Sequence, residues 1–288
     1  MNDFGKNFRI LRKERGFTLK EMSEGIISFS YLSKFEKGES DITLTNFIKL
    51  IERLNMTIDD FLCINSIKTT QHNELFQKVS VAYKNNDSES LSTYIKVEKQ
   101  LYNQTGIIFH KCNYIMILTI LQDIDSTTHI PMEDIEFLID YIVTCSFWSS
   151  YEISIIGNTL SIYPENLLYI LLEEVKKRIQ EYRVEQKNIW DLVALIENTC
   201  IILLRKKQIS QAKSLSRFLE SLLEPFNFFE RTRKLFIDGV ILIGEGKKKE
   251  GKEQAEQAID IMNVMDPNFA ADHRIELNNF LLLTFYAV

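Results

Sequence analysis

The sequence predicts an all-α protein, built from a small N-terminal helical domain and a longer array of helical hairpins. Glycine and proline are scarce, with 10 Gly and 4 Pro in 288 residues, which favours long helices over strands and tight turns. Apolar residues recur at helical spacing along the chain. Because 45% of the residues are hydrophobic, a chain of this length can bury the cores of two domains. We expect these domains at residues 1–65 and 74–288, joined by a short polar linker at residues 66–73.

The segment Phe17–Ser40 has the pattern of two short helices joined by a tight turn. Thr18 stands where an N-cap is needed and Glu21 follows three residues later, so the first helix can begin with a capping box. Ser28 can cap the second helix, and Gly38 can end it. Two such helices form a helix-turn-helix, a DNA-binding unit whose second helix enters the major groove.

Amphipathic helices are expected on both sides of this unit. One spans Asp3–Arg15, another spans Leu44–Leu54, and a third opens at Thr57. The first domain therefore contains five short helices.

The polar and basic residues that face outward in this domain are candidate DNA contacts. Arginines of the first helix are expected to anchor phosphates, whereas residues at the start of the second helix of the unit have the size and the donors to reach base edges. We expect residues 28–37 to lie in the major groove of double-stranded operator DNA. The candidate DNA-binding residues are Arg9, Arg12, Arg15, Thr18, Lys20, Ser28, Phe29, Ser30, Tyr31, Ser33, Lys34 and Lys37.

Net charge limits how such a unit can bind DNA. The chain carries a net charge of -6, and the segment 1–65 contains 10 basic and 10 acidic side chains. The affinity for DNA depends on the charge of the face that is presented to the phosphates, and not on the total charge. The segment 1–34 contains 7 basic and 4 acidic side chains, which is a local excess of positive charge. A single unit with so small an excess should bind poorly, whereas two units can bind one duplex together. We therefore expect a homodimer.

The cysteine and hydropathy patterns argue against several classes of protein. The 4 cysteines are far apart and form no Cys-x-x-Cys pair, which argues against a zinc site or a disulfide framework and favours reduced thiols. The segment Arg9–Arg15 interrupts any apolar N-terminal run, and no stretch is apolar over a length that spans a membrane. We expect a cytoplasmic protein with no metal, no other cofactor and no membrane association.

The alternative to a DNA-binding protein is an enzyme. The segment Gly244–Gly251 superficially resembles a phosphate-binding loop, but its spacing is wrong, no Ser or Thr follows the lysine, and no strand precedes it. The 4 histidines are scattered, and no Gly-x-Ser-x-Gly elbow occurs. A turn between two repeat helices explains the segment better, so we expect no catalytic activity.

The helices of the second domain are expected to alternate as hairpins. The first helix of each later pair begins near Ser149, Asn188, Phe228 and Asn268, about 40 residues apart. This period is longer than that of a tetratricopeptide repeat but is compatible with an α-solenoid of similar hairpins. In such an array the first helices line the concave side.

Polar residues recur with this period and are candidate peptide-binding residues. We call the main series the polar ladder; it consists of Asn158, Asn198, Asp238 and Asn278, spaced by 40 residues each, and of Asn113, which lies 45 residues before Asn158. Amides can donate to and accept from the unpaired backbone of an extended peptide, and an arginine can pair with a carboxylate. The same residues could instead bond to neighbouring helix ends or between repeats, and the arginines could be solvated. The remaining candidates are Tyr151, Asp191, Arg231 and Arg233.

Both domains resemble known families. The first domain is similar to the XRE/Cro-repressor family, although Leu19-Lys20 stands where that family often has Gln. The chain as a whole resembles the Rgg (also MutR or GadR) regulators of the RRNPP group, through this head, the helical repeats and the block Glu230–Gly239. The residues that carry the first resemblance are Leu11, Arg12, Gly16, Thr18, Glu21, Ser28 and the segment Leu32–Gly38.

The resemblance to the Rgg regulators implies a cytoplasmic transcription factor of Gram-positive bacteria. Such a protein typically responds to a short, imported signalling peptide, as in quorum sensing, and dimerises through its repeat domain. The alternative is a helix-turn-helix repressor whose repeat domain binds a protein partner instead of a peptide.

Overall fold

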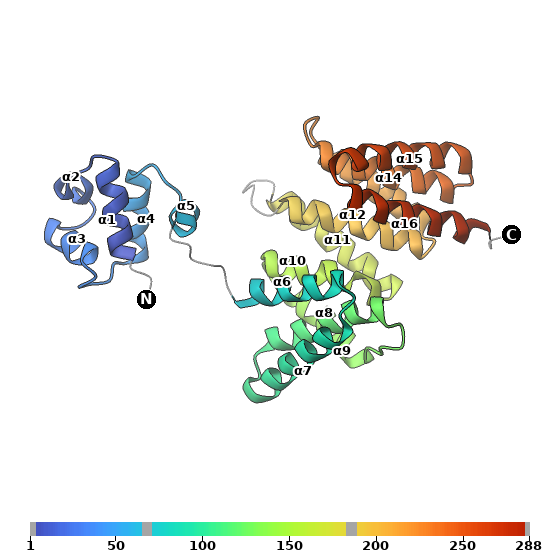
Figure 1. Ribbon diagram of the computed structural model, residues 1–288, viewed down its shortest axis with the longest axis horizontal. Coiled ribbons are helices and arrows are strands. Elements are labelled where there is room, and N and C mark those ends of the chain that lie inside the picture. The colour runs from blue at the N-terminus through green and yellow to red at the C-terminus, as the bar shows by residue number, and fades with distance from the viewer. Residues whose placement is uncertain (1–3, 65–70, 183–188, 286–288) are drawn as a thin grey trace. The chain divides into compact units, whose positions relative to one another are not determined.

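The computed structural model describes residues 4–64, 71–182 and 189–285, and every regular element in these ranges is a helix (Figure 1). The predicted all-α fold is confirmed. The chain divides into two compact units, Met1–Phe76 and Gln77–Val288. Helix α6 (Gln71–Lys84) begins inside the segment predicted as a linker and crosses the boundary between the units. The rest of that predicted linker, residues 66–70, lies outside the described residues.

The first unit is a bundle of five short helices around an aromatic core. Phe8, Phe35, Phe47 and Phe61 pack with ring centroids between 5.0 and 6.4 Å apart. Burial of one such side chain stabilises a fold by about 1.5–3 kcal/mol, so this cluster is a large part of the driving force for so small a unit. The helices are α1 (Phe4–Glu14), α2 (Leu19–Ser23), α3 (Phe29–Glu36), α4 (Leu44–Arg53) and α5 (Ile58–Ile64).

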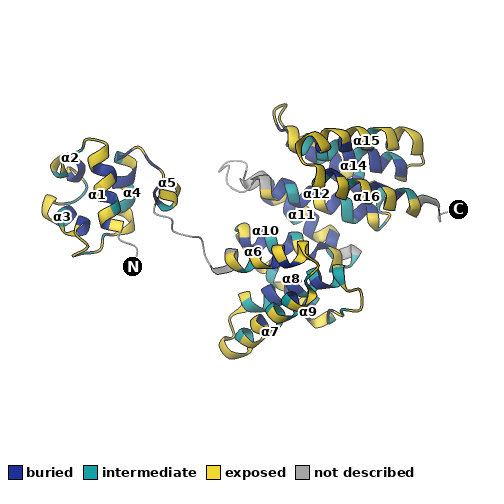
Figure 2. Ribbon diagram, in the orientation of Figure 1, coloured by how far each residue is buried: buried dark blue, intermediate teal, exposed yellow. Residues whose placement is uncertain are grey.

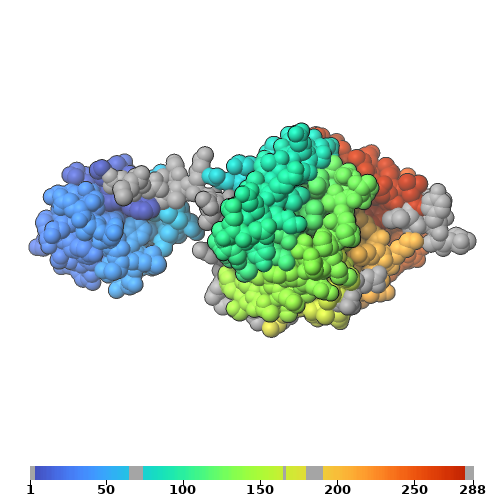
Figure 3. All heavy atoms as spheres, turned by 90° about the horizontal axis from the view of Figure 1, so that it is seen from below, coloured from blue at the N-terminus to red at the C-terminus, as the bar shows by residue number. Residues whose placement is uncertain are grey.

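The second unit consists of longer helices joined by short turns. The α7–α8 hairpin packs tightly, and in the space-filling view its surface is continuous with that of the helices that follow it (Figure 3). The elements after α6 are α7 (Ser88–Thr105), α8 (Ile108–Ile124), α9 (Met132–Thr144), α10 (Ser150–Thr159), the 3-10 turn η1 (Leu160–Ile162), α11 (Glu165–Tyr182), α12 (Ile189–Arg205), α13 (Ile209–Glu220), α14 (Phe228–Gly244), α15 (Lys248–Met265) and α16 (Pro267–Phe285).

Alternate helices of this unit form one layer. Helices α8, α10, α12, α14 and α16 each pack against the next in that series. Helix α13 bridges α12 and α14, and α15 bridges α14 and α16, so these two belong to a second layer. Buried residues lie where the helices face one another, and exposed residues lie on their outer sides (Figure 2). The expected stacking of hairpins is present, with the first helix of each later pair in one layer.

The structural repeat is one residue shorter than the expected period of about 40. Helices α14 and α16 begin at Phe228 and Pro267, and α12 and α14 end at Arg205 and Gly244, which is a spacing of 39 in both cases. One residue turns a position by about 100° around a helix axis. Residues spaced by 40 in the sequence therefore lie on different sides of successive repeat helices, and not on the single face that was predicted for them.

Two glycines allow α14 and α15 to approach closely. A Cβ atom on Gly251 would overlap the carbonyl oxygen of Gly239 and lie 2.7 Å from the Ile243 nitrogen. A Cβ atom on Gly239 would lie 2.7 Å from the Ala255 nitrogen. These neighbours are backbone atoms, so a larger residue at either position must push the two helices apart.

We predict that Gly251→Ala destabilises the protein by about 1–3 kcal/mol, which is the usual cost of overpacking a close contact. Gly157→Ala is the matched control, because a Cβ atom there comes no closer than 3.9 Å to Leu195. Alanine is favoured over glycine by about 1 kcal/mol inside a helix, so the control should melt at the wild-type temperature or above it. Thermal unfolding followed by circular dichroism measures both variants. Equal melting temperatures would contradict the close-contact argument.

Candidate DNA-binding and ligand-binding surfaces

Helix α3 presents one side to the core of the first unit and the other to solvent. Ser28 caps its start by accepting a hydrogen bond from the Tyr31 N–H at 3.2 Å, and Leu32 and Phe35 are buried. Together with α2 it forms the predicted helix-turn-helix. The predicted DNA contacts that are exposed on α3 and at its ends are Ser28, Phe29, Ser30, Lys34 and Lys37.

Helix α2 begins with the predicted capping box. The Glu21 N–H donates to Thr18 Oγ1 at 3.2 Å, and the Thr18 N–H donates to Glu21 Oε2 at 2.8 Å. The Thr18 hydroxyl donates to the same carboxylate oxygen at 2.7 Å, so its proton is held within the cap. Lys20, near the start of the same helix, is exposed.

Arg53, which the sequence analysis missed, closes the other end of α2. Its Nη1 donates to the carbonyl oxygens of Glu21, Met22 and Glu24 at 3.0, 3.1 and 2.6 Å. The last turns of a helix leave carbonyl groups without intrahelical partners, and a cation satisfies them well. In the sequence Arg53 is only a basic residue near the end of α4, which gives no sign of a contact so far away along the chain.

Arg12 does not face outward, and that prediction is wrong. Its side chain is 6% exposed, Nε donates to Glu36 Oε1 at 2.6 Å, and Nη2 donates to Glu36 Oε2 at 2.9 Å. Nη1 donates to the Phe17 carbonyl oxygen at 2.6 Å. The reason is that Glu36 is only 2% exposed, and a buried carboxylate requires a charged partner. Arg12 therefore fixes α3 to α1 and is not available to a phosphate.

The other basic residues of the first helix keep the predicted orientation. Arg9 is exposed, and Arg15 is exposed with a long hydrogen bond of 3.4 Å to the Asn55 carbonyl oxygen. Tyr31 and Ser33 on α3 are half-buried. The Tyr31 hydroxyl donates to the carbonyl oxygen of Asp41 at 2.7 Å, so a base contact by this oxygen would compete with that bond.

Two predicted peptide-binding residues belong to a buried network. The Tyr151 hydroxyl donates to Asn113 Oδ1 at 2.9 Å, and Asn113 Nδ2 donates to Glu98 Oε2 at 2.8 Å. His110 Nδ1 lies 2.8 Å from the same Glu98 oxygen. Burial raises the pKa of Tyr151, so its hydroxyl keeps its proton. Asn113 and Tyr151 are 6% and 7% exposed, and they join α7, α8 and α10 rather than face a ligand.

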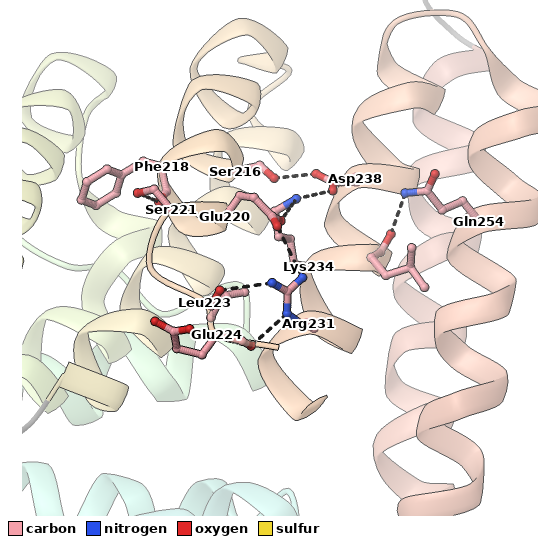
Figure 4. Close-up of polar contacts among 11 residues, drawn as sticks. Ser216, Phe218, Glu220, Ser221, Leu223, Glu224, Arg231, Lys234, Asp238 and Gln254 are labelled. Carbon is pink, nitrogen blue, oxygen red and sulfur yellow. Dashed lines mark hydrogen bonds and ion pairs between the residues drawn. The ribbon is translucent and has the colours of Figure 1, made fainter. Parts of the chain in front are cut away.

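Arg231 is also engaged within the protein. Its Nε donates to the Glu224 carbonyl oxygen at 3.0 Å and its Nη2 donates to the Leu223 carbonyl oxygen at 3.1 Å (Figure 4). These carbonyl groups follow the end of α13, so Arg231 caps the turn that leads into α14. The predicted pairing of this arginine with a ligand carboxylate would require it to leave the cap.

Asp238 lies in a cleft of about 480 Å³ between α13 and α15, over α14. The Ser216 hydroxyl donates to one of its carboxylate oxygens, and Lys234 Nζ donates to the other at 2.6 Å (Figure 4). Lys234 also pairs with Glu220 at 3.0 Å. The cleft opens on the second layer of helices, so Asp238 is not on the surface of the first layer as predicted.

Asn198 and Arg233 take part in a contact between α12 and α14. Arg233 Nη1 lies 2.6 Å from Glu197 Oε2, and Arg233 Nη2 donates to Asn198 Oδ1 at 2.9 Å. Burial raises the pKa of Glu197 to about 7, against the opposing effect of the Arg233 charge. Because Asn198 contacts α14 whereas Asp238 contacts α13, the polar ladder does not form one row. The one-residue error in the period accounts for this difference.

The accessible side of α12 forms a stripe at helical spacing. We call it the α12 stripe; it consists of Asp191, Ala194, Asn198 and Arg205, of which Ala194 is half-buried and the others are exposed. Arg205 Nε and Nη2 donate to Glu276 of α16 in two hydrogen bonds of 2.8 Å. The stripe therefore lies on the side of the first layer that α12 shares with α14 and α16. Two further predicted ligand residues, Asn158 and Asn278, are exposed on α10 and α16.

Family models match both units. Residues 91–274 match the family described as HTH-type transcriptional regulator Rgg, C-terminal domain, and residues 8–61 match a helix-turn-helix family. The chain belongs to the Rgg family of transcriptional regulators. The predicted resemblance is confirmed, and with it the predicted class of a helix-turn-helix transcriptional regulator, which is not a class of enzyme.

Solved structures share this Rgg fold over nearly the whole chain. A candidate transcriptional regulator from Listeria monocytogenes EGD-e has a TM-score of 0.83 at 23% identity, covering 98% of both chains. The SHP pheromone receptor Rgg2 of Streptococcus dysgalactiae has a TM-score of 0.76 at 24% identity, covering 96% of this chain and 99% of that one. PrgX in its complex with cCF10 has a TM-score of 0.73 at 15% identity, covering 97% of this chain and 92% of that one.

The described ranges hold neither a metal cluster nor a membrane span. Among these residues, no three His, Cys, Asp or Glu side chains come together in a way that could hold a metal ion. None of the helices in the same ranges combines the length and the apolar character needed to cross a bilayer. The 4 cysteines all lie within these ranges and are unpaired.

We predict that Arg12→Ala lowers the free energy of unfolding of the first unit by about 3–5 kcal/mol, because it leaves the Glu36 carboxylate buried without its partner. Arg9→Ala is the matched control on the same helix, where an exposed arginine should change stability by less than about 0.5 kcal/mol. Urea denaturation of the full chain measures both. A variant at Arg12 that is as stable as the control would show that the ion pair does not hold α3.

The raised pKa of Glu197 predicts a dependence of stability on pH. A carboxyl group whose pKa rises from 4.5 to about 7 on folding binds its proton more tightly in the folded state. Its stabilising contribution is therefore present at low pH and is lost as the pH rises from about 4.5 to about 7.

We predict that Glu197→Gln removes about 3 kcal/mol of the decline in unfolding free energy across this window, since each unit of pKa shift corresponds to about 1.4 kcal/mol. Urea denaturation of both proteins at several pH values between these limits is the measurement. Parallel pH profiles of wild type and variant would show that Glu197 does not titrate there.

Proposed function

We propose that this Rgg-family regulator is a cytoplasmic homodimer, without catalytic activity, whose repeat unit senses a short signalling peptide and thereby adjusts DNA binding. The family match gives the class of the protein. Proteins with a similar fold support the proposal that the ligand is a peptide, since Rgg2 is a pheromone receptor and PrgX has been solved with cCF10 and with iCF10. Another neighbour is a bacterial peptide pheromone receptor in complex with its peptide.

In this proposal α3 of each protomer lies in a major groove of the operator. The exposed residues at its start face base edges, and Arg9 and Arg15 contact the phosphate backbone. With Arg12 committed to Glu36, the first unit has fewer basic side chains for DNA than its sequence indicates. This shortage strengthens the argument for two copies on one duplex.

The observation that carries the peptide-binding part of the proposal is the α12 stripe. Its exposed amide and carboxylate groups, on Asn198 and Asp191, alternate with the small Ala194 on one side of a helix. An extended peptide laid across the first layer would find donors and acceptors there for its backbone groups. Asn158 on α10 and Asn278 on α16 are further exposed amides of the same layer.

The charges on this surface indicate the chemistry of the peptide. Arg233 is paired with Glu197, and Arg205 is paired with Glu276, so each arginine already has a carboxylate within 2.8 Å. A peptide carboxylate would have to compete with these ion pairs. We therefore infer a ligand that is recognised through its backbone and apolar side chains rather than through an acidic residue.

The same ion pairs offer a route for coupling. They join α12 to α14 and to α16, so a ligand that contacts Asn198 acts on the packing between successive repeats. Coupling requires that two arrangements of these helices differ in their affinity for the peptide.

We predict that Asn198→Ala weakens peptide binding about fivefold to tenfold, which corresponds to the loss of one hydrogen bond of about 1 kcal/mol. DNA affinity without peptide should not change. The probes are labelled synthetic peptides that correspond to short open reading frames beside the gene, and fluorescence anisotropy measures their binding. Asn263→Ala, an exposed asparagine on α15, is the matched control.

Two results would contradict the proposal. One is equal peptide affinity of the two variants, which would exclude the α12 stripe as the binding surface. The other is that none of these peptides binds while a protein co-purifies with the chain, which would favour a protein partner for the repeat unit.

A further inference from the structure

Two turns of the second unit lie against each other at one end of its C-terminal hairpins. The first turn joins α12 to α13, and the second joins α14 to α15. Ile209, the first residue of α13, packs on Gly244, the last residue of α14, where a Cβ atom would lie 2.5 Å from Ile209 Cδ1. Lys213 on α13 forms an ion pair with Glu245 in the second turn. Residues 206–217 and 244–252 therefore form one continuous surface.

This surface is strongly basic. Residues 206–217 contain four basic and no acidic side chains, and residues 244–252 contain four basic and two acidic ones. Eight against two is an excess of six positive charges within these segments, in a chain whose net charge is -6, and Lys252 pairs with Glu256, just beyond them, at 3.5 Å. We call it the basic turn surface; its basic residues are Lys206, Lys207, Lys213, Arg217, Lys247, Lys248, Lys249 and Lys252.

Most of these side chains are accessible. Lys206 and Lys213 are half-buried, and the others are exposed. Their combined field is felt by the carboxylate among them. The pKa of Glu245 lies below its usual value because Lys213 donates a hydrogen bond to it and because the charges of Lys213, Lys247 and Arg217 are close. The lowered pKa agrees with the excess of positive charge around this carboxylate.

The backbone adds to this potential. Helices α13 and α15 both begin at the basic turn surface, and neither of their N-cap residues, Gln208 and Lys247, provides a side-chain cap. The first N–H groups of a helix carry a partial positive charge and have no intrahelical acceptors. They reinforce the lysine charges in favour of an anionic partner.

The composition of the surface distinguishes between a nucleic acid and a protein partner. Protein interfaces contain a core of apolar and aromatic side chains. No exposed large hydrophobic side chain occurs in residues 206–217 or 244–252, all of which the structure describes. A phosphate backbone requires only cations and hydrogen-bond donors. The N-terminal segment 1–65, with 10 basic and 10 acidic side chains, has no net positive charge of its own.

We propose that the basic turn surface binds the phosphate backbone of duplex DNA, so that the repeat unit adds sequence-independent contacts to those of the helix-turn-helix. Each phosphate neutralised by a lysine or an arginine releases a counter-ion, which makes binding weaken as the salt concentration rises. The proposal does not depend on the peptide, and it can fail while peptide sensing stands.

The test is the salt dependence of binding to a short random-sequence duplex, measured by fluorescence anisotropy between about 50 and 200 mM salt. A fourfold variant carries Lys206→Gln, Arg217→Gln, Lys247→Gln and Lys249→Gln. If all four residues contact phosphates, the slope of log affinity against log salt becomes shallower by about 3.6, or about 0.9 for each contact. Affinity near 100 mM salt should fall by at least about tenfold.

The matched control removes the same charge elsewhere on α6, α7 and α11. It carries Lys78→Gln, Lys84→Gln, Lys96→Gln and Lys177→Gln, all at exposed positions. The slope measured for this control should differ from that of the wild type by no more than about 0.9, the contribution of one phosphate contact. A shallower slope in the fourfold variant alone supports the proposal. Equal slopes in the two variants would overturn the proposal, whether or not these slopes differ from that of the wild type. Thermal unfolding of both variants checks that the fold is intact.

Discussion

The buried ion pair between Arg12 and Glu36 is the constraint on which the DNA-binding unit depends. It joins the first helix to the end of α3 with two hydrogen bonds, and a third bond from Arg12 holds the turn at Phe17. A carboxylate buried to this extent is stable only with such a partner, so the position of α3 is tied to that of α1. The exposed side of α3 is thereby presented in one orientation, as its proposed role in reading base edges requires. The arrangement also removes one cation from the proposed DNA-binding surface.

Features that depend on residues three or four apart could be predicted from the sequence. The capping box of Thr18 and Glu21, the cap at Ser28 and the start of α14 at Phe228 all appear where they were expected. A helix start needs a particular side chain at a fixed offset, and helical periodicity reports which side is buried. Both signals are local, so a single sequence contains them.

Contacts between distant residues could not be predicted in this way. Amphipathic spacing assigns a charged residue to solvent, and nothing near Arg12 in the chain shows that Glu36 is buried beside it. Tyr151 and Asn113 are likewise brought together by the packing of α10 on α8. The polar ladder does not form the single row expected for it, and the reason is the repeat period. A period of 40 in place of 39 rotates each successive position by about 100°, which separated Asp238 from Asn198.

The charges of the repeat unit are used in two different ways. On the first layer, arginines are paired with carboxylates across neighbouring helices, as Arg205 is with Glu276, so that these charges offset one another. At the basic turn surface most cations are exposed and outnumber the anions. Because salt screens interactions beyond about 8–10 Å, these local fields decide what each surface can bind, and the total charge of -6 does not. A chain with a negative net charge can therefore present a neutral surface to a peptide and a positive one to a phosphate backbone.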